Sequence, residues 1–156
     1  IESGECAGKA VPEVAEIMGV VKKKFPEASH ENMGFGSTIF AVKPGDGSAR
    51  EQAASCQKVL GGWANIANEY ATKRYRSNLI NWGMLPFVID KDFDFDNDDY
   101  VFIPGIKDAV KNKTEVIKAY VVNKDFAEIE LRLGELTDDE RQIITDGCLI
   151  NYYKYN

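Results

Sequence analysis

The 156-residue sequence is 44% hydrophobic and 28% charged, so it holds enough apolar residues for one globular core. Its 19 lysines and arginines against 25 aspartates and glutamates give a formal net charge of −6, which argues against a general nucleic-acid-binding surface. No apolar run is long enough to span a membrane and the N-terminus lacks a signal-peptide pattern, so we expect a soluble, cytoplasmic protein without membrane or nucleic-acid partners.

The first half of the chain predicts alternating helices and strands. The segment 12–25 has apolar residues at helical spacing and ends in a lysine cluster, which suits a helix C-terminus. The elements predicted after it are a strand at 37–42, a helix at 48–60 ended by Gly61 and Gly62, a strand at 63–68, a helix at 69–82 and a strand at 85–89. This order is typical of an α/β domain. The basic residues Lys73, Arg74 and Arg76 are expected to spread over a solvated helix face.

The second half is less regular. Two strands are predicted at 115–122 and 127–133, the latter because its apolar residues alternate. The segment 137–147 predicts a capped helix, with Thr137 and Glu140 at capping-box spacing and Gly147 after its end.

Neither the cysteines nor the single histidine indicates a metal site. Cys6, Cys56 and Cys148 are odd in number, far apart and without a C-x-x-C pair, so we expect buried, reduced thiols. His30 is interpreted as a loop residue, because one histidine leaves a Ser-His-Asp triad or a histidine-rich metal site without the partners it needs.

The acidic segment "DKDFDFDNDDY" has part of the ligand spacing of a calcium-binding loop. Asp92, Asp94 and Asp96 have the first ligand spacings of an EF-hand. Asn97 stands where the glycine is needed, and Ile103 stands where the bidentate glutamate is needed. The segment is therefore interpreted as a solvated acidic loop.

The segment "GDGSAREQAA", residues 45–54, suggests an anion site at a helix start. Gly45 and Gly47 permit tight turns that let a ligand approach backbone N–H groups. Ser48 is predicted to cap the helix, with Glu51 at the reciprocal capping-box position. Arg50 adds a planar, charged fork suited to a carboxylate or phosphate. A glycine turn with a capping box also occurs without any ligand, so both interpretations stay open on the residues alone.

Two motifs in this order resemble the aconitase family. Its G-x-G-S-S-R-[ED] turn is similar to "GDGSARE", and its H-x-x-N-L…G-x-L-P-[LF] segment is similar to "YRSNLINWGMLPF" at 75–87. The resemblance covers about residues 36–89 and points to the family's C-terminal swivelling domain. The ending "LTDDERQIITDGCLINYY" is also similar to the C-termini of some single-chain members.

The resemblance implies a set of site residues. Ser48 and Arg50 take the positions of the first serine and the arginine, which contact the substrate carboxylate and active-site groups, so both are candidate catalytic residues. With Gly47 and Ala49 they form the expected substrate-binding turn. Ala49 stands where the family has its general base, and a methyl group accepts no proton. In the second motif Tyr75 replaces the histidine, and the matching residues, interpreted as structural, are Asn78, Leu79, Gly83, Leu85 and Pro86.

These observations give one expected fold and several expected functions. We predict an α/β swivelling domain with three-layer β/β/α architecture and a mixed sheet, spanning 1–156 as the C-terminal fragment of a longer hydratase. The expected function is the substrate-closing domain of an aconitase-type hydro-lyase acting on a small hydroxy or unsaturated carboxylic acid. The resemblance implies a 4Fe-4S cluster held by other domains of the protein or by a large subunit, so this chain alone should be inactive and bind no cofactor. The alternatives are a separate small subunit of an isopropylmalate-type dehydratase and a non-catalytic anion-binding module.

Overall fold

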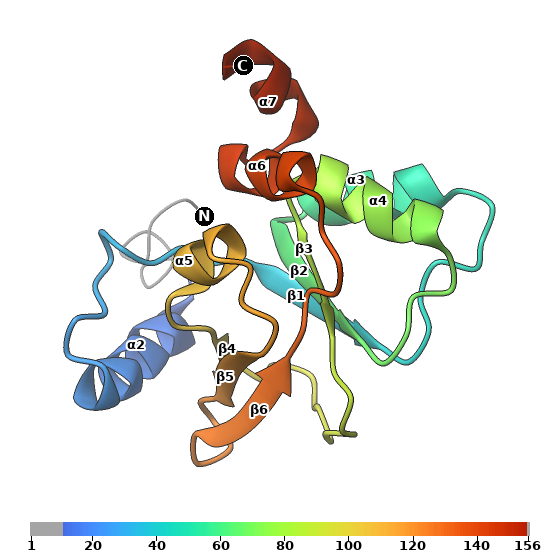
Figure 1. The fold of residues 1–156 in the computed structure, drawn as a ribbon. Coiled ribbons are helices and arrows are strands. Elements are labelled where there is room, and N and C mark those ends of the chain that lie inside the picture. Colours follow the sequence, from blue (N-terminus) through green and yellow to red (C-terminus); the bar gives the residue numbers. More distant parts are fainter. Residues whose placement is uncertain (1–10, 156) are drawn as a thin grey trace.

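Residues 11–155, which the computed structural model describes, form two small β-sheets with helices on their outer faces (Figure 1). The first sheet is parallel and has the order β1-β2-β3. Its strands are β1 (Ser37–Ala41), β2 (Gly62–Ala67) and β3 (Leu85–Val88). They are connected by α3 (Arg50–Val59) and α4 (Lys73–Asn81), which lie together on one face of this sheet. Each predicted strand of the first half is confirmed.

The second sheet is antiparallel and has the order β4-β5-β6. Its strands are β4 (Val101–Phe102), β5 (Ile117–Val121) and β6 (Ala127–Leu131). The two sheets are joined by an antiparallel bridge, in which Val88 N donates to Arg132 O at 2.7 Å and Arg132 N donates to Val88 O at 2.9 Å. The mixed α/β fold class is thus confirmed, with its parallel and antiparallel parts in two sheets joined by this bridge.

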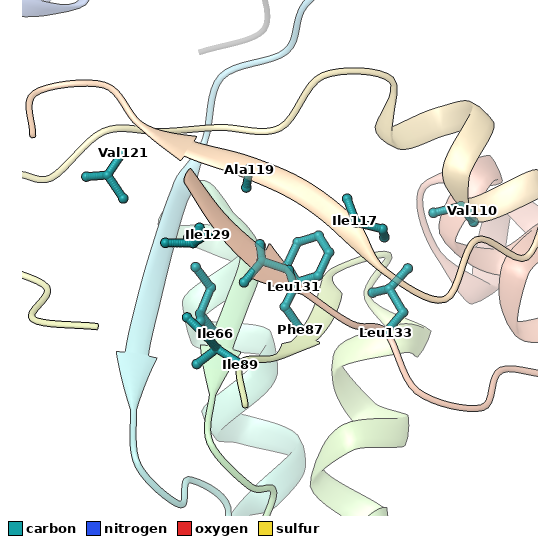
Figure 2. Close-up of a cluster of buried hydrophobic side chains, with 11 residues drawn as sticks. Ile66, Phe87, Ile89, Val110, Ile117, Ala119, Val121, Ile129, Leu131 and Leu133 are labelled. Carbon is teal, nitrogen blue, oxygen red and sulfur yellow. The ribbon is translucent and has the colours of Figure 1, made fainter. Parts of the chain in front are cut away.

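The main core lies between the two sheets (Figure 2). In β6 the core residues Ile129 and Leu131 alternate with the exposed residues Glu128 and Glu130, as expected for a strand with one buried face. Side chains of the parallel sheet, including the fully buried Phe87, point toward them from the other side. On the outer face of the antiparallel sheet, α2 (Pro12–Lys24) packs through a second cluster that contains Val21, Val122 and Phe126.

Local sequence signals predict one helix in the second half of the chain and miss the others. The predicted capping box of α6 (Asp138–Asp146) is confirmed, since Thr137 and Glu140 bond reciprocally and Gly147 has a φ of 92°. Sequence reasoning missed β4, α5 (Ile106–Lys111) and α7 (Leu149–Tyr155). These elements are short, and α7 buries none of its side chains, so neither a long periodic pattern nor a burial pattern marks it.

Several expectations about individual residues are wrong. Cys56 is exposed and Cys148 is half-buried, whereas Cys6 lies outside the described residues. Arg76 does not lie on a solvated face: its Nη2 donates to the carbonyls of Leu133 at 2.7 Å and Glu135 at 2.8 Å. The helix α4 begins later than predicted, because the residues before Thr72 bond to the segment that follows β1. Within 11–155 no helix is long and apolar enough to cross a membrane.

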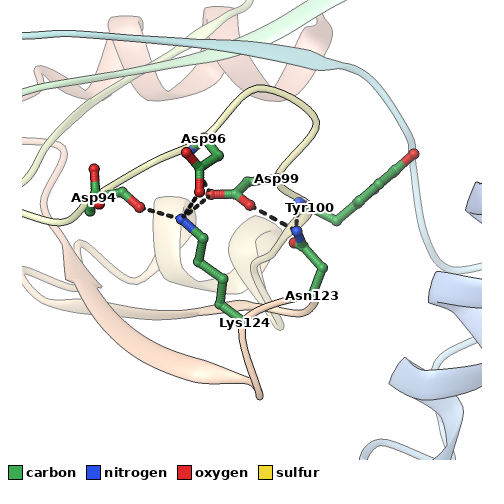
Figure 3. Close-up of polar contacts among 6 residues, drawn as sticks. All are labelled: Asp94, Asp96, Asp99, Tyr100, Asn123 and Lys124. Carbon is green, nitrogen blue, oxygen red and sulfur yellow. Dashed lines mark hydrogen bonds and ion pairs between the residues drawn. The ribbon is translucent and has the colours of Figure 1, made fainter.

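The acidic loop after β3 is organised by one lysine (Figure 3). Lys124 Nζ lies 2.8 Å from the Asp96 carboxylate and 3.0 Å from that of Asp99, and it also donates to the Asp94 carbonyl. Asn123 Nδ2 donates to Asp99 at 2.8 Å. Burial by itself raises the pKa of Asp99, but hydrogen bonds from the Asp96 amide, Asn123 and Lys124 outweigh it and hold that pKa below its ordinary value. These aspartates bind a side chain of the protein itself.

We expect Lys124→Gln to lower the free energy of unfolding at pH 6.5 and to have a smaller effect at pH 3. Because the pKa of Asp99 is lower in the folded state, its ion pair stabilises the fold above the unfolded pKa of about 3.9 and loses this effect as pH falls through the folded value. Urea unfolding of both proteins at the two pH values measures the difference. Lys118→Gln is the control, since Lys118 forms an exposed pair with Glu128. A Lys124→Gln effect of equal size at both pH values would contradict the role of this pair.

Candidate functional site

A cavity of about 220 Å³ lies where the chain passes from β1 into α3. This position is at the carboxyl end of a parallel strand and at the N-terminus of a helix, where α/β proteins commonly bind ligands. Gly45 has a φ of 98°, a backbone conformation that L-residues rarely adopt and that favours glycine. The residues that line the cavity are Gly45, Gly47, Ala49, Arg50, Ala53 and Tyr75.

The start of α3 has no side-chain cap, so the predicted capping box of Ser48 and Glu51 is wrong. The helix begins at Arg50 with Ala49 as its N-cap residue, and a methyl group accepts no hydrogen bond. Ser48 therefore lies before the cap position. The first intrahelical bond runs from Ala53 N to Ala49 O at 2.9 Å, so the preceding amides of the first turn have no acceptor inside the helix. Within residues 11–155 these amides also have no other acceptor, so they can donate to a ligand.

Arg50 lines the cavity, and one hydrogen bond orients its guanidinium. Its Nε donates to the Gly45 carbonyl at 3.3 Å, and its terminal nitrogens have no hydrogen-bond partner among residues 11–155. The side chain is half-buried. Two free nitrogens in one plane match the two oxygens of a carboxylate. A cation at the positive end of a helix is unfavourable by itself, and a bound anion would compensate for both charges.

The first turn of α4 forms the opposite wall. The Tyr75 side chain packs against Gly45 so closely that a Cβ atom at Gly45 would lie 2.6 Å from its Cβ, Cγ and Cδ1 atoms. Thr72 caps α4, and its hydroxyl accepts from Tyr75 N at 3.2 Å and donates to Gly45 O at 3.3 Å. The glycine carbonyl thus has two donors, Arg50 at the start of α3 and Thr72, which caps α4.

Buried polar side chains connect the two helices beneath the cavity. Gln57 Nε2 on α3 donates to Asn65 Oδ1 on β2, and Asn65 Nδ2 donates to the Tyr75 hydroxyl at 3.0 Å. Asn65 is only 1% exposed. Burial raises the pKa of Tyr75 even though the bond from Asn65 lowers it, so this phenol is not a base at neutral pH. Sequence reasoning missed this network, although a polar residue inside the buried strand "WANIAN" could have indicated it.

The structure gathers most of the sequence-predicted site residues in one place. Gly47, Ala49 and Arg50 all line the cavity, whereas Ser48 is exposed, does not line it and makes no hydrogen bond through its side chain within the described range. The second motif forms α4 and β3, where Leu79 is fully buried in a cluster with Ala54, Tyr75 and Met84.

The described residues do not fit a 4Fe-4S cluster. Such a cluster needs several thiolates at one site, but residues 11–155 contain no group of three or more His, Cys, Asp or Glu side chains able to hold a metal ion. A larger hollow of about 360 Å³ is lined by residues 89–93, Glu128, Ile129, Glu130 and Arg132. Arg132 there is paired with Asp90 at 3.0 Å, so its charge is already balanced.

A family profile and individual relatives give consistent matches to this chain. Residues 10–92 match the profile of the family described as aconitase C-terminal domain. Over 132 residues, 79% of the chain, it is 31% identical to aconitate hydratase A of Rickettsia bellii, of which the match spans 15%. Over 143 residues, 90% of the chain, it is 33% identical to the methanogen homoaconitase small subunit of Methanocaldococcus jannaschii, of which the match spans 72%. The chain thus spans a small part of the length of aconitate hydratase A and most of the length of the homoaconitase small subunit.

Proposed function

We propose that this chain, which belongs to the aconitase family as a C-terminal swivelling domain, closes over a small hydroxy or unsaturated carboxylic acid in a hydro-lyase. The observation that carries this proposal is the oriented Arg50 guanidinium, which lines a cavity at an uncapped helix start. The guanidinium would hold one carboxylate of the acid through two nitrogens, and the free amides of the first turn of α3 would add donors.

We propose that a residue other than Ala49 acts as the base of the reaction. Alanine cannot remove a proton, and the buried phenol of Tyr75 has a raised pKa that keeps it protonated. Ser48 remains a candidate, because domain closure could bring an exposed hydroxyl next to a substrate held on another domain. Otherwise the remaining domains supply the base, and this chain contributes carboxylate binding and the exclusion of water.

The 4Fe-4S cluster is proposed to reside on other domains, because the described residues offer no set of thiolates for it. Two arrangements fit this proposal. The chain, as one domain over 1–156, is the C-terminal part of a longer cytoplasmic hydratase, or it is a small subunit that pairs with a large one, like the small subunit from Methanocaldococcus jannaschii. A neighbouring coding region with three cluster cysteines would support an enzyme in either form. A non-catalytic anion-binding module, which Ala49 favours, would lack that partner.

A titration of the chain with tricarballylate, a stable tricarboxylate, tests the proposed site. We expect chemical-shift changes in the amide NMR spectrum at residues 47–52 and binding in the millimolar range. Arg50→Gln should weaken binding by about tenfold, because a charge-assisted contact is lost. Arg132→Gln is the matched control, since it removes an arginine from the other hollow. Absence of binding, or equal binding by Arg50→Gln, would refute the proposed role of this turn.

A further inference from the structure

We infer that the first turn of α4 positions the Arg50 guanidinium, and that Thr72 and Tyr75 are positioning residues of the carboxylate site. This inference rests on the function proposed above. It gives the start of α4 a role in orienting the Arg50 guanidinium, which the glycine turn and α3 do not orient by themselves.

The Gly45 carbonyl is hydrogen-bonded to side chains at the starts of both α3 and α4. It accepts a hydrogen bond from Arg50 Nε and another from Thr72 Oγ1, each at 3.3 Å. The Thr72 hydroxyl also accepts from Tyr75 N at 3.2 Å, so both its donor and its acceptor capacity are used. The direction of this carbonyl, and with it the plane of the guanidinium, therefore depends on Thr72.

The turn is also held along its length by the segment that precedes α4. Glu69 N donates to Val42 O at 3.0 Å, and Ala71 N donates to Pro44 O at 2.9 Å. These bonds bring the chain from β1 to Gly45 alongside the chain that enters α4. The turn before α3 therefore moves with the start of α4.

Two buried hydrogen bonds fix the orientation of the Tyr75 side chain. Asn65 holds its hydroxyl, and Gln57, two turns after Arg50 on α3, holds Asn65. The Gln57 Oε1 atom is buried without a hydrogen-bond partner among the described residues, which is a cost that an apolar side chain would avoid. A requirement for one fixed Tyr75 orientation explains these amides better than stability does. That orientation keeps the ring against Gly45.

Orientation matters because a two-point contact with a carboxylate depends on the plane of the guanidinium. If Gly45 O turns away, Nε loses its partner and the terminal nitrogens no longer face the cavity together. Arg50 would keep its positive charge but would lose the two-point contact with the carboxylate.

The test compares two Thr72 variants. Thr72→Val keeps the side-chain shape without the hydroxyl, and we expect it to weaken tricarballylate binding by about tenfold. Thr72→Ser restores the hydroxyl and should bind within about threefold of wild type. Thr38→Val is the matched control, because the Thr38 hydroxyl also donates to a backbone carbonyl, that of Ala64 at 3.0 Å, and lies away from the cavity. Tyr75→Phe, which keeps the ring, should lie between these cases.

The Arg50 Nε–Hε resonance of the ligand-free protein provides a second measurement that needs no ligand. We expect its proton to exchange with water faster in Thr72→Val than in wild type or Thr72→Ser. If Thr72→Val exchanges and binds like wild type, the inference is overturned; should that variant fail to fold, the same two measurements on Tyr75→Phe decide. If Thr72→Val speeds the exchange of the Arg50 Nε proton but tricarballylate binding does not depend on Arg50, the proposed function is refuted. The positioning role of Thr72 then still stands.

Discussion

In the proposed hydro-lyase, Arg50→Lys is expected to lower kcat/KM about 30-fold, which corresponds to about 2 kcal/mol of transition-state binding. Lysine keeps the positive charge but has one nitrogen, so it can neither donate to Gly45 O and the carboxylate in one plane nor form a two-point contact. The loss is large because Arg50 is half-buried and a poorly made charged contact is not fully replaced by water.

Steady-state kinetics over a panel of hydroxy and unsaturated acids measure this effect. Arg132→Lys serves as the control, because Arg132 is paired with Asp90 and lies outside the cavity that Arg50 lines. We expect the control to retain wild-type rates with every accepted acid. Wild-type rates in Arg50→Lys would remove Arg50 from the site and, with it, the main support for the proposed function.

Gly83→Ala is expected to lower the free energy of unfolding by about 4 kcal/mol or more. Gly83 follows α4 with a φ of 68°, and a Cβ atom there would overlap the backbone carbonyl group of Gly147. Gly147 ends α6 with a φ of 92°, so neither backbone segment can move without disturbing a helix end. The missing Cβ atom of Gly83 allows the α4 and α6 ends to approach closely.

Urea unfolding of Gly83→Ala and Gly19→Ala provides a matched comparison. Gly19 lies inside α2, and a Cβ atom there would meet nothing within 4 Å. Alanine has the higher helix propensity, so Gly19→Ala should be neutral or stabilising by up to about 1 kcal/mol. A loss below about 1 kcal/mol in Gly83→Ala would show that the close approach to Gly147 is not maintained in solution.

The features that the sequence by itself determined are those with local causes. The helix over 12–25 follows from apolar spacing with lysines at its end, and the structure places α2 there. The capping box of Thr137 and Glu140 is a contact between residues three positions apart, so it needs no distant partner. The family resemblance was equally readable, because each of its two motifs is a continuous stretch of sequence.

Only the tertiary structure decided where α3 begins and what surrounds Arg50. A Ser48 cap was locally reasonable, but the turn is bonded to the segment before α4, and the helix starts at Arg50 instead. Arg76 likewise looked solvated until the fold brought the carbonyls of Leu133 and Glu135 to it. The Asn65 network joins two helices and a strand. Such contacts depend on which segments pack together, and local spacing does not encode that pairing, because many distant residues could satisfy the same hydrogen-bonding groups.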